Sequence, residues 1–451
     1  MHPVASKSGK AAPPLPDGGW GWMVVAATWF INLSIHGFGS CIGLLAKPMM
    51  EEFQVSNKMG SVILSVHEGL FYGTGKLAAF LCKKFGYRIT AIIGVVVTMI
   101  GSALSYYATN IWVMYFTVGV VMGVGCGILY FLSTAILGMY FKKRISRAMG
   151  ISASGAGFGT VSFSYVYALL ISSIGWRWVF VALLPVFCLC AVCATTFAPL
   201  KSAPGVEENK DNKEIQGQEV SQPMDIGEQR NGTKPLLSKR LLIYVISNFL
   251  TSAAYHSVLY FLPVHAANIG LDPNEESRML FVYGISNTIM RILVGIVADH
   301  KLPLPRGLGA DTARNRLWIY LISLASCGIL ISFCFVFTGY YSLAIFSGLF
   351  GVLIAADQSL TPVILVDIVD PEKRMEALSV LFLFQGVATV VGPVVCGILA
   401  DLTGGFTLPF ALCGVCLFVS GIMIVGIHLL QQREARARAP AIRMSELDDT
   451  Q

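Results

Sequence analysis

The sequence predicts an all-α integral membrane protein with twelve transmembrane helices arranged in two six-helix halves. Of its 451 residues, 55% are hydrophobic and only 13% are charged, against roughly 25% charged residues in a soluble domain. Long stretches contain no Asp, Glu, Lys or Arg at all. These gaps lie between Asp17 and Lys47, Arg88 and Lys142, Arg177 and Lys201, Arg240 and Asp272, Arg316 and Asp357, and Asp401 and Arg433.

The length of these gaps favours helices over strands. A spanning helix needs about 20 apolar residues and a barrel strand about 10, and backbone polar groups in lipid must be satisfied within the element. Two of the longest gaps contain two helices each, because Ala108-Thr109-Asn110 and Thr338-Gly339-Tyr340 interrupt them. The predicted helices are 22–46, 60–82, 89–108, 111–138, 147–172, 178–199, 241–267, 279–299, 317–337, 341–366, 376–399 and 407–431.

Basic residues occur in alternate loops, and this asymmetry predicts the orientation, because short loops rich in Lys and Arg stay in the cytoplasm. They follow the second, fourth, eighth and tenth helices, as Lys83, Lys84 and Arg88, then Lys142, Lys143, Arg144 and Arg147, then Lys301, Arg306, Arg314 and Arg316, then Lys373 and Arg374. The other loops are short and nearly neutral or acidic. Both termini and the central loop are therefore predicted to be cytoplasmic. The net charge of +6 follows from this topology and gives no basic patch for nucleic acid.

A polar segment without apolar periodicity divides the chain, and it is predicted to be a disordered cytoplasmic linker. The predicted organisation is a cytoplasmic N-terminal segment, an N-terminal half, this linker, a C-terminal half and a cytoplasmic tail, at residues 1–21, 22–200, 201–240, 241–432 and 433–451. In each half a basic pair precedes a Gly-rich fifth helix, at Lys143-Arg144 and at Lys373-Arg374. Two such halves around a midplane site describe the major facilitator architecture.

Ionisable residues inside spans are candidates for function, because a charge at the bilayer centre costs a few kcal/mol. Arg291 and Asp357 both lie near the middle of the membrane by the helical rise of about 1.5 Å per residue. A guanidinium fork matches a carboxylate, so our hypothesis is that a substrate anion competes with Asp357 for Arg291. A permanent ion pair that only fixes helix register is the alternative. Lys47, by position alone, is a snorkelling residue, and His67 beside Glu68 is more typical of a structural histidine.

Motifs of other protein classes are missing from the sequence. It contains no phosphate-binding Gly-rich loop with Lys and Ser or Thr, no HExxH and no paired-cysteine metal site. The eleven cysteines fall mostly inside apolar spans without metal or disulfide spacing. We therefore predict no enzyme activity, no cofactor, no metal, no nucleic-acid partner and no ATP-driven transport.

Two motifs resemble the signatures of the monocarboxylate transporter family, solute carrier family 16. The first is Asp17-Gly18-Gly19-Trp20-Gly21-Trp22 at the start of the first helix. The second is Tyr140-Phe141-Lys142-Lys143-Arg144, with Ala148-Met149-Gly150 after it. The resemblance extends over residues 16–432. It implies a structural role for Asp17, Trp20 and Trp22, and a role in conformational change for Lys142, Lys143 and Arg144.

The resemblance also implies a substrate site. In lactate-type members a Lys at the outer end of helix one and an Arg in helix eight hold the carboxylate, near a Tyr in helix two; Lys47, Arg291 and Tyr72 match them. The family's proton-coupling Asp, four residues before that Arg, is Asn287 here, which leaves Asp357 or Lys47 for the proton. The aromatic and hydroxyl specificity positions of helix ten are here Ile354 and Gln358.

The predicted function is secondary transport of monocarboxylates or related small organic acids across the plasma membrane by alternating access, with proton coupling left open. One alternative is proton-independent facilitated transport of aromatic amino acids or similar amphiphiles. Another is a non-transporting membrane receptor or sensor. The expected partners are the organic acid, the lipid bilayer and, as open possibilities from the resemblance, a proton and a single-span immunoglobulin-type glycoprotein.

Overall fold

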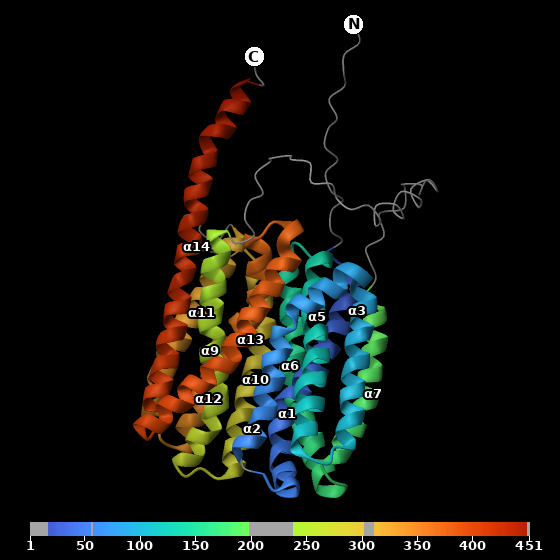
Figure 1. Cartoon of the computed structure of the whole chain (residues 1–451). Coiled ribbons are helices and arrows are strands. Elements are labelled where there is room, and N and C mark those ends of the chain that lie inside the picture. The colour runs from blue at the N-terminus through green and yellow to red at the C-terminus, as the bar shows by residue number, and fades with distance from the viewer. Residues whose placement is uncertain (1–16, 56, 198–237, 302–310, 449–451) are drawn as a thin grey trace, which may run out of the picture.

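A bundle of long helices makes up the protein (Figure 1). The computed structural model describes residues 17–55, 57–197, 238–301 and 311–448, and no strand occurs in these ranges. The helices of the first half are α1 Trp20–Phe53, α2 Asn57–Gly73, α3 Gly75–Tyr106, α4 Ile111–Met114, η1 Tyr115–Met122, α5 Gly123–Tyr140, α6 Ile145–Ser173 and α7 Arg177–Thr195. Those of the second half are α9 Lys239–Asn268, α10 Pro273–Ala298, α11 Thr312–Ser332, η3 Cys334–Val336, α12 Tyr340–Ile368, η4 Pro371–Lys373, α13 Arg374–Thr403 and α14 Thr407–Asp448.

Eleven helical stretches of the described chain are long and apolar enough to cross a membrane. The twelfth crossing is divided. The 17-residue α2 ends at Gly73, and α3 is two helices joined at Gly86, whose φ of +78° breaks the helical path. The second crossing thus consists of α2 and the start of α3, and the third is the rest of α3. The all-α fold with twelve helices is confirmed.

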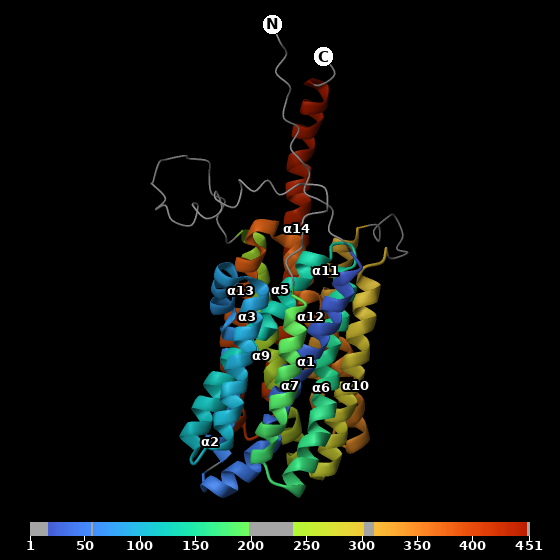
Figure 2. The same cartoon turned by 90° about the vertical axis from the view of Figure 1, so that its right-hand side faces the viewer.

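The halves lie side by side and meet along two seams. In one seam α6 of the first half packs against α10 of the second, as seen in Figure 2; in the other α13 of the second half packs against α2 of the first. The predicted repeat consists of α6 and α13, the Gly-rich fifth helices of the two halves. Each of them packs against a helix of the opposite half, because small residues allow close approach of helix backbones.

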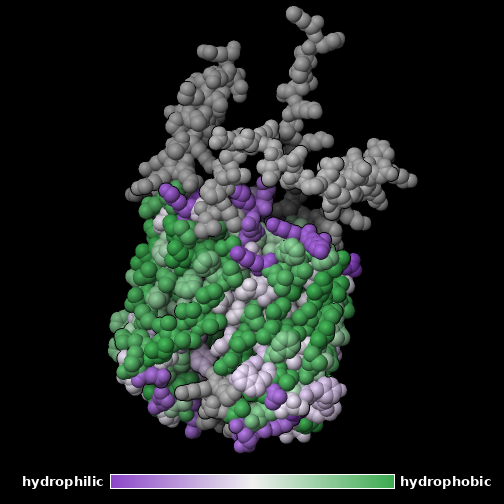
Figure 3. Space-filling view, in the orientation of Figure 1, coloured by the Kyte–Doolittle hydropathy of each residue, from purple (hydrophilic) through white to green (hydrophobic). Residues whose placement is uncertain are grey.

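An apolar belt surrounds the bundle. Figure 3 shows hydrophobic residues over the middle of the molecule and hydrophilic ones near both ends. Large side chains such as Phe80, Trp112 and Leu402 expose 62%, 67% and 78% of their surface. Such exposure is expected where the neighbouring solvent is lipid, because acyl chains are as apolar as the side chains.

The ends of the bundle agree with an even number of crossings. The start of α1 and the end of α14 lie at the same end, uppermost in Figure 1, which we term the predicted cytoplasmic end. The second half begins at Lys239, and α14 continues unbroken to Asp448, so the predicted tail of residues 433–451 starts within a helix. Residues 1–16 and the predicted linker from 201 to 237 lie outside the described residues.

Candidate functional site

Arg291 of α10 lies buried at the seam between the halves, with 7% of its surface exposed. Its Nη1 donates to the backbone oxygen of Ala153, in α6 of the first half, at 2.6 Å. Its Nη2 donates to Oε1 of Gln358, in α12 of the second half. Both acceptors are neutral, and no described carboxylate contacts the guanidinium. A buried cation without an anion in direct contact is costly, and the Asp357 carboxylate interacts with the guanidinium electrostatically but without a hydrogen bond. This position therefore attracts an anionic ligand.

Asp357 of α12 has other partners than the predicted one. Its Oδ1 accepts hydrogen bonds from the Tyr320 hydroxyl at 2.7 Å and from Thr361 Oγ1 at 3.2 Å. Asp357 interacts electrostatically with Arg291, but the two side chains do not form an ion pair in this conformation. The reason is rotational, since Gln358, one residue along the helix, is the side chain that faces Arg291.

A polar network extends from Asp357 through the core of the second half. Asn248 of α9 donates to the Tyr320 hydroxyl at 3.4 Å, and Gln385 of α13 donates to Asn248 Oδ1 at 2.6 Å. Sequence reasoning missed these three residues. Asn248 and Gln385 stand as amides in otherwise apolar spans, and that signal could have found them.

The other predicted substrate residues lie in different surroundings. Asn287 is 2% exposed and donates to the Gly351 oxygen at 2.9 Å, so in this conformation it joins α10 to α12, and Ile354 of α12 is wholly buried. Lys47 belongs to α1, and its side chain is outside the described part of the structure. Its backbone lies eleven residues beyond His36, roughly 16 Å along the helix.

Aromatic rings from both halves meet within electrostatic reach of Arg291, and we term them the interface aromatic cluster: His36, Tyr72, Tyr130, His256 and Phe382. Tyr130 stacks on Phe382 with ring centroids 5.0 Å apart, and Tyr72 contacts His256 edge-on at 5.5 Å. The His36 ring is 5.2 Å from that of Tyr130. Arg291 interacts electrostatically with His36, Tyr72 and Tyr130. Of this cluster only Tyr72 was predicted as a site residue, because aromatic residues are ordinary in apolar spans.

The two family signatures form a single contact at the predicted cytoplasmic end. Asp17 Oδ1 accepts hydrogen bonds from three consecutive backbone N–H groups, of Lys142 at 2.8 Å, Lys143 at 2.9 Å and Arg144 at 3.3 Å. The carboxylate thereby holds the loop between α5 and α6 against the start of α1. Sequence reasoning found both motifs but not that one binds the other.

The two tryptophans of the first signature complete this contact. Trp22 packs edge-on against Phe141 with centroids 5.1 Å apart. Trp20 is 53% exposed and donates from Nε1 to the Thr196 oxygen at 3.1 Å. An indole with an exposed face and a bonded N–H, as Trp20 has, suits the headgroup level.

Replacing Asp17 by Ala should destabilise the protein, because three N–H groups lose a charged acceptor. We expect a loss of about 2 kcal/mol or more, measured as a lower thermal unfolding midpoint of the purified protein in detergent. Asp401→Ala is the control, since Asp401 is exposed near the end of α13. Equal midpoints for Asp17→Ala and the wild type would contradict a stabilising role.

A second network joins the halves at this end. Asp299, which caps α10, accepts from the backbone N–H groups of Ser146 at 3.1 Å and Arg147 at 2.8 Å at the start of α6. Arg316 of α11 pairs with Asp299 at 2.9 Å and with Asp367 of α12 at 3.0 Å. Sequence reasoning counted Arg316 only among the basic loop residues and missed both aspartates.

Replacing Asp299 by Asn should weaken closure at this end. Arg316 and Asp299 have side chains only 5% and 3% exposed, and removing one partner of a buried pair costs about 3–5 kcal/mol. We expect faster amide hydrogen exchange at residues 145–150, measured by mass spectrometry. Asp370→Asn, at an exposed carboxylate, should leave exchange there as in the wild type. If amide hydrogen exchange at these residues is the same in Asp299→Asn as in the wild type, Asp299 does not help to close this end.

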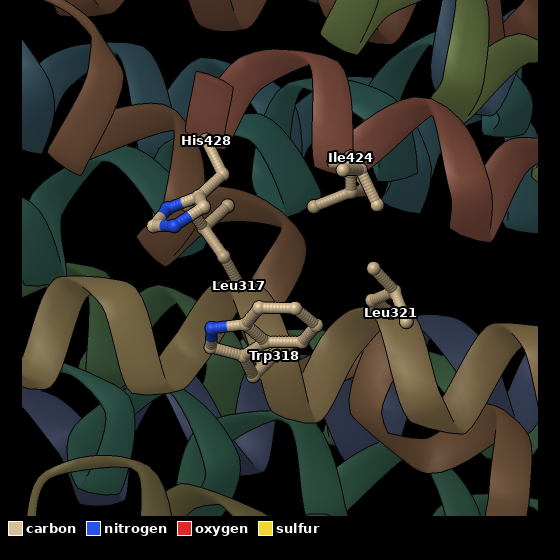
Figure 4. Close-up of a pocket in the computed structure, with 6 residues that line it drawn as sticks. Leu317, Trp318, Leu321, Ile424 and His428 are labelled. Atoms are coloured by element: carbon tan, nitrogen blue, oxygen red, sulfur yellow. The ribbon is translucent and has the colours of Figure 1, made fainter. Parts of the chain in front are cut away.

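A surface groove lies away from the seams, in the second half (Figure 4). It is lined by Leu317, Trp318 and Leu321 of α11 and by Ile424, Val425 and His428 of α14. The lining is mainly apolar and includes no lysine or arginine. The groove therefore lacks the strong positive charge that would bind a small organic anion, which Arg291 provides at the seam.

Comparison with known proteins agrees with the twelve-helix fold. The sequence matches the family described as the Major Facilitator Superfamily over residues 28–313 and 310–445. The chain belongs to the major facilitator superfamily. The solved structure of the proton:xylose symporter XylE bound to 6-bromo-6-deoxy-D-glucose is similar to this facilitator, with a TM-score of 0.70 at 15% identity, covering 90% of this chain and 95% of that one. This similarity confirms the fold.

Curated relatives confirm the family recognised from the two signatures. This facilitator is 26% identical over 441 residues to Monocarboxylate transporter 12 of Xenopus laevis, covering 96% of this chain and 94% of the relative. It is 27% identical over 461 residues to Monocarboxylate transporter 10 of Rattus norvegicus, covering 98% and 86%. These relatives are transporters and not enzymes. The protein is thus a multi-pass membrane protein and a secondary transporter with a small-molecule substrate.

Proposed function

We propose that this facilitator moves monocarboxylates or related small organic acids across the plasma membrane by alternating access, with Arg291 binding the carboxylate. The observation that supports it is the buried guanidinium between the halves, which is bonded only to neutral oxygens of Ala153 and Gln358. A carboxylate accepts from the guanidinium fork in two parallel hydrogen bonds. It also supplies the negative charge that the site lacks.

Substrate binding would also change how the halves contact each other. Arg291 now connects the halves, because Ala153 belongs to α6 and Gln358 to α12. A carboxylate that takes both N–H donors frees Ala153, and with it one connection across the seam. The anion thereby favours the conformation in which the halves separate, which is how a ligand with differential affinity shifts a population.

The remaining predicted residues have supporting roles in this proposal. Tyr72 and Gln358 border the carboxylate site, Asn287 and Ile354 shape the packing of α10 on α12, and Lys47 attracts the anion from the predicted outer end. Both termini are proposed to be cytoplasmic from the charges of the loops. Because the family's coupling Asp is Asn287 here, the sequence leaves Asp357 or Lys47 as the proton-linked group, and the immunoglobulin-type partner stays a prediction from the resemblance.

The interface aromatic cluster favours a second candidate, proton-independent transport of aromatic amino acids or similar amphiphiles. Rings from both halves stack on one another within electrostatic reach of Arg291, and separating them would expose faces on which an aromatic substrate can pack. Such ring pairs contribute about 0.5–1.5 kcal/mol beyond burial. A substrate with a carboxylate and an aromatic ring would satisfy both parts of the site.

Uptake into proteoliposomes tests these proposals. The purified protein is reconstituted, and uptake of labelled pyruvate, lactate and tryptophan is measured with and without a pH gradient. Accumulation of pyruvate or lactate supports the first candidate, and tryptophan uptake that ignores the gradient supports the second. Ligand binding without flux would reveal a receptor or sensor and contradict both.

A further inference from the structure

Glu68 is an acidic side chain within α2, in the second crossing, and the transport proposal above does not use it. Its carboxylate makes no hydrogen bond or ion pair with any residue that the structure describes. Asp357, by contrast, accepts hydrogen bonds from two hydroxyl groups. A carboxylate in a membrane span is costly unless it is paired or protonated. An unbonded one is therefore suited to taking up a proton.

A buried imidazole points to the same place as this carboxylate. A Cβ at Gly39 of α1 would lie 3.3 Å from Glu68 Oε1 and 3.6 Å from His67 Nε2, so both atoms lie within 4 Å of one point. His67 is wholly buried, and its Nε2 has no hydrogen-bond partner. The absent side chain of Gly39 leaves the space in which these two groups converge.

The other ring nitrogen of His67 fixes which form the histidine takes. Nδ1 lies 3.2 Å from the backbone oxygen of Val118. Because a carbonyl only accepts, Nδ1 holds the hydrogen, and Nε2 of the neutral ring is an acceptor. Val118 belongs to η1, a π-helical stretch inside the fourth crossing, and such stretches are frequent at functional sites. An acceptor beside Glu68 suits the protonated carboxyl group, which is a donor.

The titratable neighbours of Glu68, besides His67, come from two helices. They are Tyr72 on the same helix, and Cys126 and Tyr130 of α5. The helix α13 faces α2 with apolar groups such as Val390, which lies against Gly69. His36 of α1 interacts electrostatically with both His67 and Arg291, so the Glu68 site adjoins the proposed carboxylate site.

We propose that Glu68, together with His67, is the proton-binding site of this transporter. The inference rests on the proposed function, because it assigns the coupling ion of the same carrier. Ionised Glu68 repels an anion near Arg291, since like charges repel strongly in a low dielectric. Protonation removes that repulsion, so proton and organic anion bind cooperatively, and by linkage each raises the affinity of the other.

The transport cycle then balances in charge. One proton enters from the side with the lower pH and protonates the Glu68 carboxylate, where the new O–H faces His67 Nε2. The anion binds Arg291, and the loaded carrier exposes both sites to the opposite side. There the proton and the anion leave. One proton moves with each monovalent anion, and the step is electroneutral.

Glu68→Gln tests the inference in proteoliposomes with two assays. In the first, vesicles loaded with unlabelled acid exchange it for labelled acid at equal pH on both sides. In the second, an inward proton gradient drives net accumulation. Glu68→Gln should still exchange but without the wild-type dependence on pH, and it should lose gradient-driven accumulation. Glu51→Gln, at an exposed carboxylate near the end of α1, should accumulate like the wild type.

The outcomes separate the inference from the proposed function. If the wild type exchanges none of the organic acids, that result contradicts the proposed function itself. A wild type that exchanges but ignores the gradient, or a Glu68→Gln variant that still accumulates, overturns the inference alone. Loss of accumulation in Asp357→Asn combined with its retention in Glu68→Gln would place the proton at Asp357 instead.

A measurement on the wild-type protein tests the inference even if the Glu68→Gln variant fails to fold. Dicyclohexylcarbodiimide reacts with protonated carboxyl groups in apolar surroundings, where the acid O–H adds across the carbodiimide to give an O-acylisourea that rearranges to a stable N-acylurea. We expect mass spectrometry to find the adduct on Glu68, with less labelling as the pH rises. Absence of the adduct across the pH range would overturn the inference.

Discussion

Arg291→Lys should raise the KM for organic acid uptake by about 10-fold to 100-fold. Lysine keeps the positive charge but presents a single ammonium instead of a planar fork, so it cannot form two parallel bonds to one carboxylate. Loss of one charge-assisted hydrogen bond costs about 1.5–3 kcal/mol, and about 1.4 kcal/mol corresponds to a factor of ten. The measurement is the initial rate of uptake into proteoliposomes over a range of substrate concentrations.

A matched control lies on the same helix. Arg278 is exposed near the start of α10, so Arg278→Lys makes the same chemical change away from the seam and should keep the wild-type KM. Arg291→Lys with normal affinity would argue against two-bond capture of the carboxylate. It would leave the fold untouched but remove the central contact of the proposed mechanism.

Gly150→Ala should abolish most transport by keeping the halves apart at the predicted cytoplasmic end. A Cβ at Gly150 of α6 would lie 2.5 Å from the backbone oxygen of Arg291 and 3.0 Å from the Cα of Gly295, both in α10. Backbone atoms cannot turn aside as a flexible side chain can, so the helices must separate. Overpacking of this kind costs about 1–3 kcal/mol, which changes the ratio of closed to open carriers by about 5-fold to 150-fold.

Two further glycines distinguish this effect from loss of folding. Gly138→Ala should behave like the wild type, because the nearest atom, on Val366, would be 3.8 Å away. Gly155→Ala should lower thermal stability, since its Cβ would lie 2.2 Å from the Trp29 oxygen within the first half. Gly150→Ala should keep its stability, lose uptake and show faster hydrogen exchange in α6 and α10 near this contact. Uptake by Gly150→Ala at the wild-type rate would contradict the prediction that transport requires close approach of α6 and α10 at this seam.

Predictions from the sequence were most accurate where the signal is local. The hairpin break at Ala108-Thr109-Asn110 lies between helices in the structure, where Asn110 caps the following helix. Thr338 and Gly339 also lie between helices, and Tyr340 begins α12. Lipid offers no hydrogen bonds, so each crossing must satisfy its own backbone. Length and hydropathy therefore determine the crossings without knowledge of their neighbours. The division of the second crossing between α2 and α3 was not predicted.

Contacts between side chains depended on helix rotation, which the sequence does not contain. Asp357 and Gln358 are consecutive residues, yet they point about 100° apart around the helix axis. One meets Tyr320 and the other meets Arg291. A rule based on charge selects Asp357 as the partner of Arg291, and the packing of α10 against α12 selects Gln358. The docking of Asp17 on Lys142, Lys143 and Arg144 is likewise a contact between segments about 125 residues apart.

The sequence by itself determined the membrane class, the helical crossings, the predicted orientation, the family and the buried arginine, because hydropathy, loop charge and short motifs act within single segments. Only the tertiary structure decided which groups surround that arginine, that the two signatures bind each other, and that Glu68 and His67 converge at Gly39. Those contacts depend on the rotation and depth of each helix, which are set by packing against helices distant in the sequence.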